Sequence, residues 1–239
     1  MINILDKGTI DKIAAGEVVE RPASIVKELL ENSIDAGSSS ITVEIKNGGI
    51  DLIRITDNGC GIDSKEVKTA FLRHATSKIV SDKDLISIKS LGFRGEALSS
   101  IAAVSRCEII TKTRDELTGV RYYMEGGVEV EFEEIGAPDG TSIIIRDIFY
   151  NTPARRKFLK TSSTEGAHIS ELVEKMAMSN TDIAFKFISN NQVKLQTNGN
   201  GNLKDIIYQL YGKEISKALC AVCLLYTSPS PRDGLLSRM

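Results

Sequence analysis

Hydrophobic and polar residues alternate along many short segments of the chain. A period of two is typical of strands that are buried on one face only. Two of the predicted strand pairs are separated by residues that favour tight turns, Asn47-Gly48-Gly49 and Asn190-Asn191. The pattern predicts strands over residues 41–46, 50–56, 107–112, 119–124, 128–135, 141–147, 184–189 and 192–197.

Apolar residues three and four positions apart predict helices in other segments. Pro22 suits the first turn of a helix over residues 22–35, and Gly37 ends it. Asp63 and Glu66 have the spacing of a capping box, which predicts a helix that continues to about Phe71. The remaining predicted helices cover residues 96–103, 165–178 and 203–211.

The helix over residues 22–35 has one polar and one apolar face. Residues separated by four and seven positions lie on one side of a helix, which groups Glu28, Asn32 and Asp35. The opposite face carries Val26, Leu29, Leu30 and Ile34. A carboxylate can polarise water, and an amide oxygen can bind a hard cation. On its own, the pattern favours an ordinary solvated face.

Two glycine-rich segments suggest further chemistry. Asp57-Asn58-Gly59-Cys60-Gly61 follows a predicted strand, where the aspartate could accept an adenine N–H and the glycines could admit a flat ligand. A tight turn is the alternative. Gly92-Phe93-Arg94-Gly95-Glu96-Ala97-Leu98 runs into a helix, so its N–H groups could bind phosphate, or it is a plain junction. Thr141, after Asp139-Gly140, could close the adenine side.

Composition narrows the class of protein. The 239 residues include 41% hydrophobic and 26% charged residues, as in ordinary globular proteins. No apolar run approaches the ~20 residues of a membrane span, and the first residues do not resemble a signal peptide. Four cysteines without a disulfide pattern favour a cytoplasmic location.

The net charge of −2 restricts any DNA contact to a local basic patch. Arg155, Arg156, Lys157 and Lys160 form the densest one. They could contact DNA phosphates or be a solvated helix start.

In their order along the chain, these motifs resemble the ATP-binding fold that gyrase, Hsp90 chaperones, sensor histidine kinases and MutL share. The resemblance is more specific to the MutL family in four segments: residues 13–22, 73–78, 92–98 and 149–158. It covers roughly residues 1–220. It implies an α/β fold: a two-layer sandwich of a mixed, mostly antiparallel sheet with helices on one face, known as the Bergerat or GHKL ATPase fold.

The resemblance also implies roles for individual residues, with ATP and Mg2+ as cofactors. Glu28 would be the general base, and Asn32 would bind Mg2+ and the nucleotide. Asp57 would bind the adenine amino group, Gly61 would leave room for the base, and Thr141 would support the pocket. The other nucleotide contacts would come from Thr76, Ser77, Lys78, and the lid formed by Gly92, Phe93, Arg94, Gly95, Glu96, Ala97 and Leu98.

Three regions are expected on this basis. Residues 1–200 would form the ATPase domain, residues 201–222 the truncated start of a ribosomal-S5-like domain, and residues 223–239 a disordered tail unlike the family. The family's γ-phosphate lysine comes from the second domain, so it would be missing here.

The implied function is a slow ATP-hydrolysing switch of DNA mismatch repair that couples mismatch recognition to strand incision. The expected partners are a MutS-type recognition protein, DNA, a second copy in an ATP-dependent homodimer, and a nuclease or the protein's own C-terminal domain. The alternatives are another ATPase of the same fold, such as a topoisomerase subunit, and a nucleotide- or DNA-binding fragment without turnover of its own.

Overall fold

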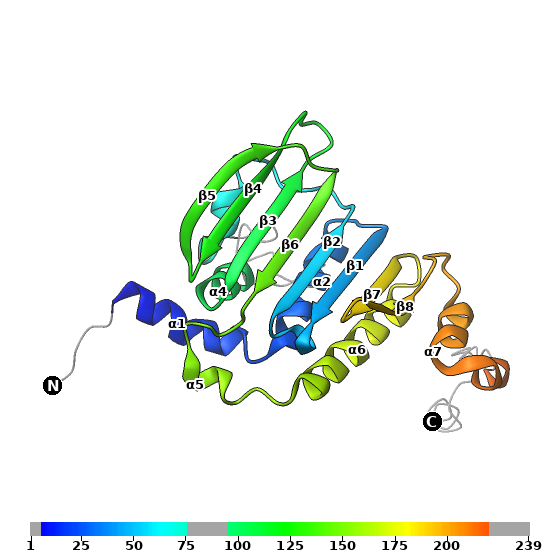
Figure 1. Ribbon diagram of the computed structural model, residues 1–239. Coiled ribbons are helices and arrows are strands. Elements are labelled where there is room, and N and C mark those ends of the chain that lie inside the picture. Colours follow the sequence, from blue (N-terminus) through cyan, green and yellow to red (C-terminus); the bar gives the residue numbers. More distant parts are fainter. Residues whose placement is uncertain (1–5, 76–94, 220–239) are drawn as a thin grey trace, which may run out of the picture.

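One eight-stranded sheet organises the computed structural model, which describes residues 6–75 and 95–219 (Figure 1). Its strand order is β5-β4-β3-β6-β2-β1-β7-β8. Neighbouring strands are antiparallel except for β1 and β7, which are parallel. The strands are β1 (Ser40–Lys46), β2 (Leu52–Asp57), β3 (Arg106–Lys112), β4 (Gly119–Glu125), β5 (Val128–Ile135), β6 (Gly140–Arg146), β7 (Ala184–Ser189) and β8 (Gln192–Gln196).

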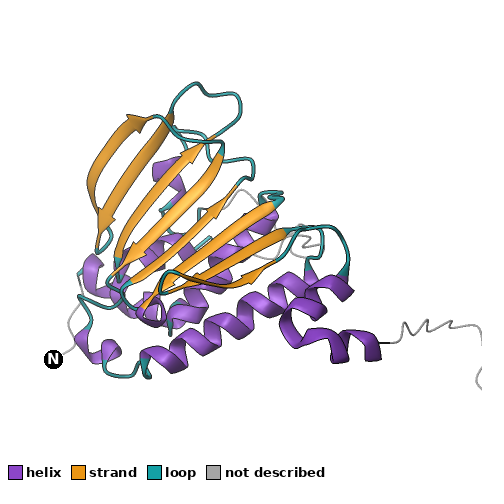
Figure 2. Ribbon diagram, turned by 45° about the vertical axis from the view of Figure 1, so that its right-hand side comes forward, coloured by secondary structure: helices purple, strands orange, loops and turns teal. Residues whose placement is uncertain are grey.

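The helices gather on one face of this sheet, as Figure 2 shows in purple. A 3-10 turn, η1 (Asn47–Gly49), joins β1 to β2. The predicted two-layer, mostly antiparallel architecture is therefore confirmed. The α-helices are α1 (Lys7–Val18), α2 (Pro22–Asp35), α3 (Val67–Ala70), α4 (Ala97–Ala103), α5 (Pro153–Arg156), α6 (Ser162–Ser179) and α7 (Leu203–Ala218). Within residues 6–75 and 95–219, none of them has the length and apolar character needed to cross a bilayer.

Strand register explains where the core forms. Directly paired residues of neighbouring strands point to the same face, so the alternating isoleucines line up in rows across the sheet. One row is Val43–Ile55–Ile143–Ile109, which crosses β1, β2, β6 and β3. Helix α2 packs on this face with Ile25, Val26, Leu29 and Leu30, all at most 1% exposed. Each such side chain contributes about 1.5–3 kcal/mol through burial.

The other face of the sheet carries ion pairs. The polar positions of the alternating strand pattern lie on this face. The Arg121 guanidinium lies 2.5, 2.8 and 2.9 Å from carboxylate oxygens of Glu108, Glu131 and Glu133, respectively. Hydrogen bonds to Glu108 and Glu133 are the main reason that the pKa of Arg121 is raised further above its ordinary value. Arg121 therefore stays charged and links β3, β4 and β5.

Two helices differ from the prediction. The capping box at Asp63 and Glu66 is only half formed. Asp63 Oδ1 accepts from the Lys65 N–H at 2.8 Å, but the Glu66 side chain makes no cap and α3 begins only at Val67. The Asp63 carbonyl also accepts from the N–H groups of Glu66 and Val67, which makes a turn before the helix. At the other end, α7 extends beyond Tyr211 to Ala218, with non-helical backbone at Gly212 (φ 82°, ψ 179°).

Helix α1 has no counterpart among the predicted helices. Gly8 and Gly16 lower helix propensity inside this segment, by about 1 kcal/mol each relative to alanine. The sequence signal for this helix is its N-terminal cap, because Asp6 Oδ1 accepts from the Thr9 N–H at 2.9 Å. Hydrogen bonds from the Thr9 side chain and backbone lower the pKa of Asp6. A stable N-cap can begin a helix whose interior residues do not favour one.

The expected domain boundary after residue 200 stays a prediction. Helix α7 packs on α6, and its Ile206 is 3% exposed and belongs to the main hydrophobic core. The expected tail at residues 223–239 lies outside the described residues.

Candidate functional site

The rows of isoleucines on the helix-covered face end in polar residues. In the register that follows the row of Ile55, Asp57 pairs with Thr141, and Thr141 pairs with Thr111. The Thr111 and Thr141 hydroxyls lie 3.1 Å apart. Polar groups thus replace aliphatic ones where β2, β6 and β3 meet the edge of the helical layer. The clustered carboxylate and hydroxyls could bind the polar groups of a ligand.

Asp57 is held by three hydrogen bonds. Its Oδ2 accepts from the Ser33 hydroxyl at 2.9 Å, and its Oδ1 accepts from the Ser38 hydroxyl at 3.2 Å and the Gly59 N–H at 2.9 Å. Ser33 and Ser38 are both 4% exposed. Because Ser33 belongs to α2, the contact fixes the end of β2 against the helix that carries Glu28 and Asn32.

The predicted separation of faces on α2 is confirmed. Val26, Leu29 and Leu30 are buried, while Glu28 and Asn32 are only partly covered. The Glu28 side chain is 31% exposed, and its Oε1 lies 3.9 Å from the Lys27 ammonium. Helix α2 also contacts α4 and β2. A carboxylate and an amide thus lie one turn apart on the helix that supports Asp57.

Three glycines allow backbones to approach closely around Asp57. A Cβ at Gly140 (φ 110°) would overlap the Asp57 carbonyl oxygen, and one at Gly61 (φ 73°) would overlap the Lys112 carbonyl oxygen. At Gly59 it would lie 2.7 Å from Ser38 Oγ. The structural need for Gly61 is thus its contact with the end of β3. Its predicted role of leaving room for a base stays a prediction.

Glu116 fixes the loop that contains Gly61. One carboxylate oxygen accepts from the Ser64 N–H at 3.0 Å, and the other from the Thr113 N–H at 3.2 Å and the Thr113 hydroxyl at 2.8 Å. The hydrogen bonds from Ser64, followed by those from Thr113, lower the pKa of Glu116 from 4.5 to about 2. The charged form of Glu116 therefore links the loop over residues 61–66 to the turn after β3.

We expect the Glu116→Gln variant to lose a contribution to stability that depends on pH. The folded-state pKa of about 2 lies below the ordinary value of 4.5, so this contribution is present above about pH 4.5 and is lost as the pH falls toward 2. Urea unfolding of both proteins across this range measures it. The difference between them should shrink on acidification, and a difference that grows would contradict the role of Glu116.

The second glycine-rich motif is only partly described. Thr76, Ser77, Lys78, Gly92, Phe93 and Arg94 lie outside the described residues. A Cβ at Gly95 (φ 61°) would lie 2.7 Å from the Ala75 carbonyl oxygen, and Glu96 Oε1 lies 3.0 Å from His74 Nδ1. Ala97 and Leu98 begin α4, and Leu98 packs against the core. The two chain segments that flank residues 76–94 are therefore in contact.

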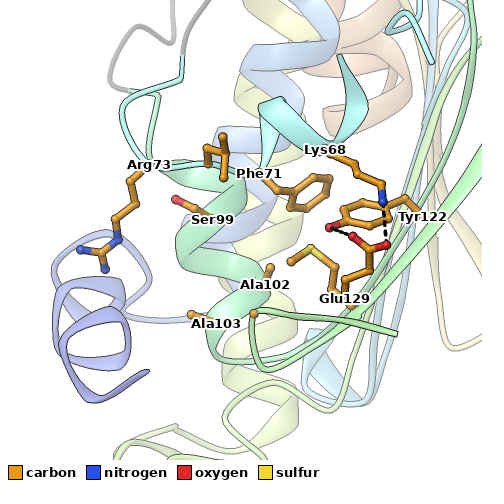
Figure 3. A pocket seen from close by; sticks show the side chains of 11 residues that line it. Lys68, Phe71, Arg73, Ser99, Ala102, Ala103, Tyr122 and Glu129 are labelled. Atoms are coloured by element: carbon orange, nitrogen blue, oxygen red, sulfur yellow. Dashed lines mark hydrogen bonds and ion pairs between the residues drawn. The ribbon is translucent and has the colours of Figure 1, made fainter. Parts of the chain in front are cut away.

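A separate cavity of about 310 Å3 lies between α3, α4 and β4 (Figure 3). None of the predicted site residues lines it. Lys68 Nζ lies 2.6 Å from Glu129 Oε1, and the Tyr122 hydroxyl donates to Glu129 Oε2 at 3.3 Å. Desolvation, with the Glu129 charge second, raises the pKa of Tyr122 to about 12. Lys68, Tyr122 and Glu129 thus bind one another at this cavity, which shares no lining residue with the candidate site.

Several supporting residues were not singled out from the sequence. A serine among leucines on the buried side of α2 was a signal for Ser33, because a buried hydroxyl needs a partner. Thr111 interrupts the apolar alternation of Cys107 and Ile109 in the same way, and its hydroxyl accepts from the Ile62 N–H at 2.9 Å. Ser38 and Glu116 lie in loops, where no periodicity marks them.

The comparison with protein families agrees with this arrangement. Residues 20–136 match the family described as histidine kinase-, DNA gyrase B-, and HSP90-like ATPase. The match contains α2, the Asp57 loop and the glycine-rich segment before α4. The fold and the site thus define an ATPase-fold protein of this class.

Comparison with individual proteins identifies the family within this class. The chain is 68% identical over 221 residues to the DNA mismatch repair protein MutL of Agathobacter rectalis, covering 92% of the chain and 34% of that protein. It is 55% identical over 218 residues to MutL of Caldanaerobacter subterraneus, covering 91% and 37%. A solved structure of the Aquifex aeolicus MutL ATPase domain, complexed with ADP, matches with a TM-score of 0.67 at 31% identity, covering 81% of the chain and 70% of that one.

The chain belongs to the MutL family. It spans about a third of the length of the curated relatives that it matches.

Proposed function

We propose that this chain binds ATP with Mg2+ and hydrolyses it slowly, as a switch of DNA mismatch repair. The observation that carries the proposal is the link from Asp57 through Ser33 to α2. It joins a potential base-reading carboxylate to the helix with Glu28 and Asn32. The Aquifex relative in complex with ADP supports a nucleotide as the ligand.

Adenine recognition fits the hydrogen-bond capacity of Asp57. An ionised carboxylate offers about four acceptor positions. Ser33, Ser38 and Gly59 use three of them. The remaining position suits a single N–H from the exocyclic amino group of adenine, and a guanine, with a carbonyl there, would face a carboxylate oxygen. Thr141 would support the base from the next strand.

Hydrolysis would depend on Glu28 and Asn32. Glu28 would orient the water that attacks the γ-phosphorus and accept its proton while the bond to the ADP oxygen breaks. The amide oxygen of Asn32 fits Mg2+, which binds through one or two protein oxygens and otherwise through phosphates and water. When bound, the metal would neutralise phosphate charge. The partly described segment Gly92–Leu98 would supply backbone N–H groups to the phosphates.

The cellular role rests on the family. A MutS-type mismatch-recognition protein, DNA, a strand-incising nuclease and a second copy of the chain are the proposed partners. ATP binding would favour association of two copies, and hydrolysis would reset them. Slow turnover suits such a switch, because the lifetime of the ATP-bound state sets the lifetime of the signal.

Nucleotide titration beside a phosphate-release assay tests the proposal. We expect saturable ATP binding by calorimetry, slow phosphate release that a chelator of Mg2+ stops, and much weaker binding of GTP. Binding without release would favour the alternative of a nucleotide-binding fragment. Absence of binding to either nucleotide would refute the proposed function.

A further inference from the structure

Two of the family-like segments meet at a contact that the proposed function leaves unexplained. Arg155 Nη2, in the turn of α5, donates to the Ile13 carbonyl oxygen of α1 at 3.1 Å. Gly16 of the same helix lies directly under this guanidinium, and a Cβ there would overlap it. These residues are 142 and 139 positions apart in sequence. The contact therefore connects α1 to a distant part of the chain, and any side chain at position 16 would require the guanidinium to move.

Helix α1 buries only a narrow apolar strip against the rest of the protein. Among its described side chains, only that of Ala15 is fully buried, while Ile10 and Ile13 are 43% and 52% exposed. Burial of apolar surface is what normally holds a helix in place. A polar contact can therefore add to the packing of α1 on α4.

The segment before Arg155 provides a rigid support for the contact. Phe149 is fully buried and its N–H donates to the Val104 carbonyl at 2.8 Å. Asn151 Nδ2 donates to the Ala103 carbonyl at 2.9 Å. The segment is thus bound to the end of α4, which also packs on α1. Figure 1 shows α1 between α4 and α5. The hydrogen bond from Arg155 to Ile13 thus connects α1 to a segment that is itself bound to α4.

We propose that Arg155 is a positioning residue that holds α1 against α4 and thereby fixes the start of α2, which begins four residues after α1 ends. Arg155 is half-buried, whereas Arg156, Lys157 and Lys160 are exposed. Its guanidinium binds the backbone of α1, so it differs from the solvated cations of the basic patch. The link from α1 to catalysis rests on the proposed function, but the contact itself does not.

Amide hydrogen exchange of nucleotide-free protein tests the contact. Arg155→Ala should raise exchange across residues 7–18 about 10-fold or more, and Arg155→Lys should raise it less, because an ammonium can still donate to one carbonyl. Gly16→Ala should also displace the guanidinium and raise exchange, but less than Arg155→Ala, because alanine favours the helix by about 1 kcal/mol relative to glycine. The double variant should exchange no faster than Arg155→Ala alone, since both changes remove one interaction. Lys213→Ala, which removes an exposed charge on α7, is the control.

Steady-state kinetics tests the link to the site. If α1 positions α2, Arg155→Ala should lower kcat for ATP about 10-fold while changing the affinity for ADP less than twofold, with partial rescue by lysine. Unchanged exchange in α1, or additive effects in the double variant, would overturn the contact. Altered exchange with normal kcat would restrict Arg155 to a structural role and overturn the positioning role. A wild-type protein without ATPase activity would refute the proposed function, while the exchange results would still decide the contact.

Discussion

Replacing Glu28 by alanine is expected to reduce ATP turnover by at least ~100-fold, the scale of lost general-base catalysis. Nucleotide binding should persist, because the hydrogen bonds that hold Asp57 come from Ser33, Ser38 and Gly59 and not from Glu28. Single-turnover phosphate release measures the first effect, and calorimetric titration of ATP measures the second. The expected result is a protein that binds ATP and retains it.

Two further variants make the Glu28 result specific. Glu28→Gln keeps the shape and a weak hydrogen bond but cannot accept a proton at neutral pH, so it should be about as slow as the alanine variant. Lys27→Ala removes the neighbouring ammonium, which lies 3.9 Å from Glu28 and 3.2 Å from Glu31. If turnover fell equally in Lys27→Ala, local electrostatics and not proton transfer would explain the loss. Normal turnover in Glu28→Ala would remove Glu28 from the mechanism.

The fold could be predicted wherever periodicity was strong. The strand and helix patterns located all eight strands and the buried face of α2, because burial on one side imposes the alternation. Helix α1 could not be found in this way. Its interior glycines lower the helix propensity of the segment. One of them, Gly16, lies against the Arg155 guanidinium, and this contact forms only in the folded chain.

The candidate site, like the fold, could be predicted only in part. Asp57 and Thr141 could be singled out because they stand at strand ends, but their pairing depends on the register between β2 and β6. No local sequence pattern determines that register, because it depends on how two distant strands pair. Ser33 and Thr111 needed the structure for a related reason. A small polar residue in an apolar pattern indicates a buried hydrogen bond, but its partner lies on another element.

Replacing Asp57 by asparagine should weaken ATP binding about 100-fold, which corresponds to about 2.7 kcal/mol. Both carboxylate oxygens of Asp57 accept hydrogen bonds. An asparagine amide has one oxygen, and its NH2 group must face either a serine hydroxyl or the ligand. The Ser33 hydroxyl can rotate to accept, so folding should tolerate the change. The acceptor position left for adenine is then lost or becomes a donor.

The selectivity between nucleotides distinguishes a base-reading Asp57 from a structural one. If Asp57 reads the adenine amino group, Asp57→Asn should lose affinity for ATP and ADP alike but keep its weak affinity for GTP, so the preference for adenine falls. Ser33→Ala, which removes one supporting hydrogen bond and leaves the carboxylate, should reduce ATP affinity by a smaller factor, on the order of 10-fold. Urea unfolding of each variant checks that the fold persists. An Asp57→Asn protein that loses stability and affinity for all three nucleotides equally would show that Asp57 only holds β2 against α2.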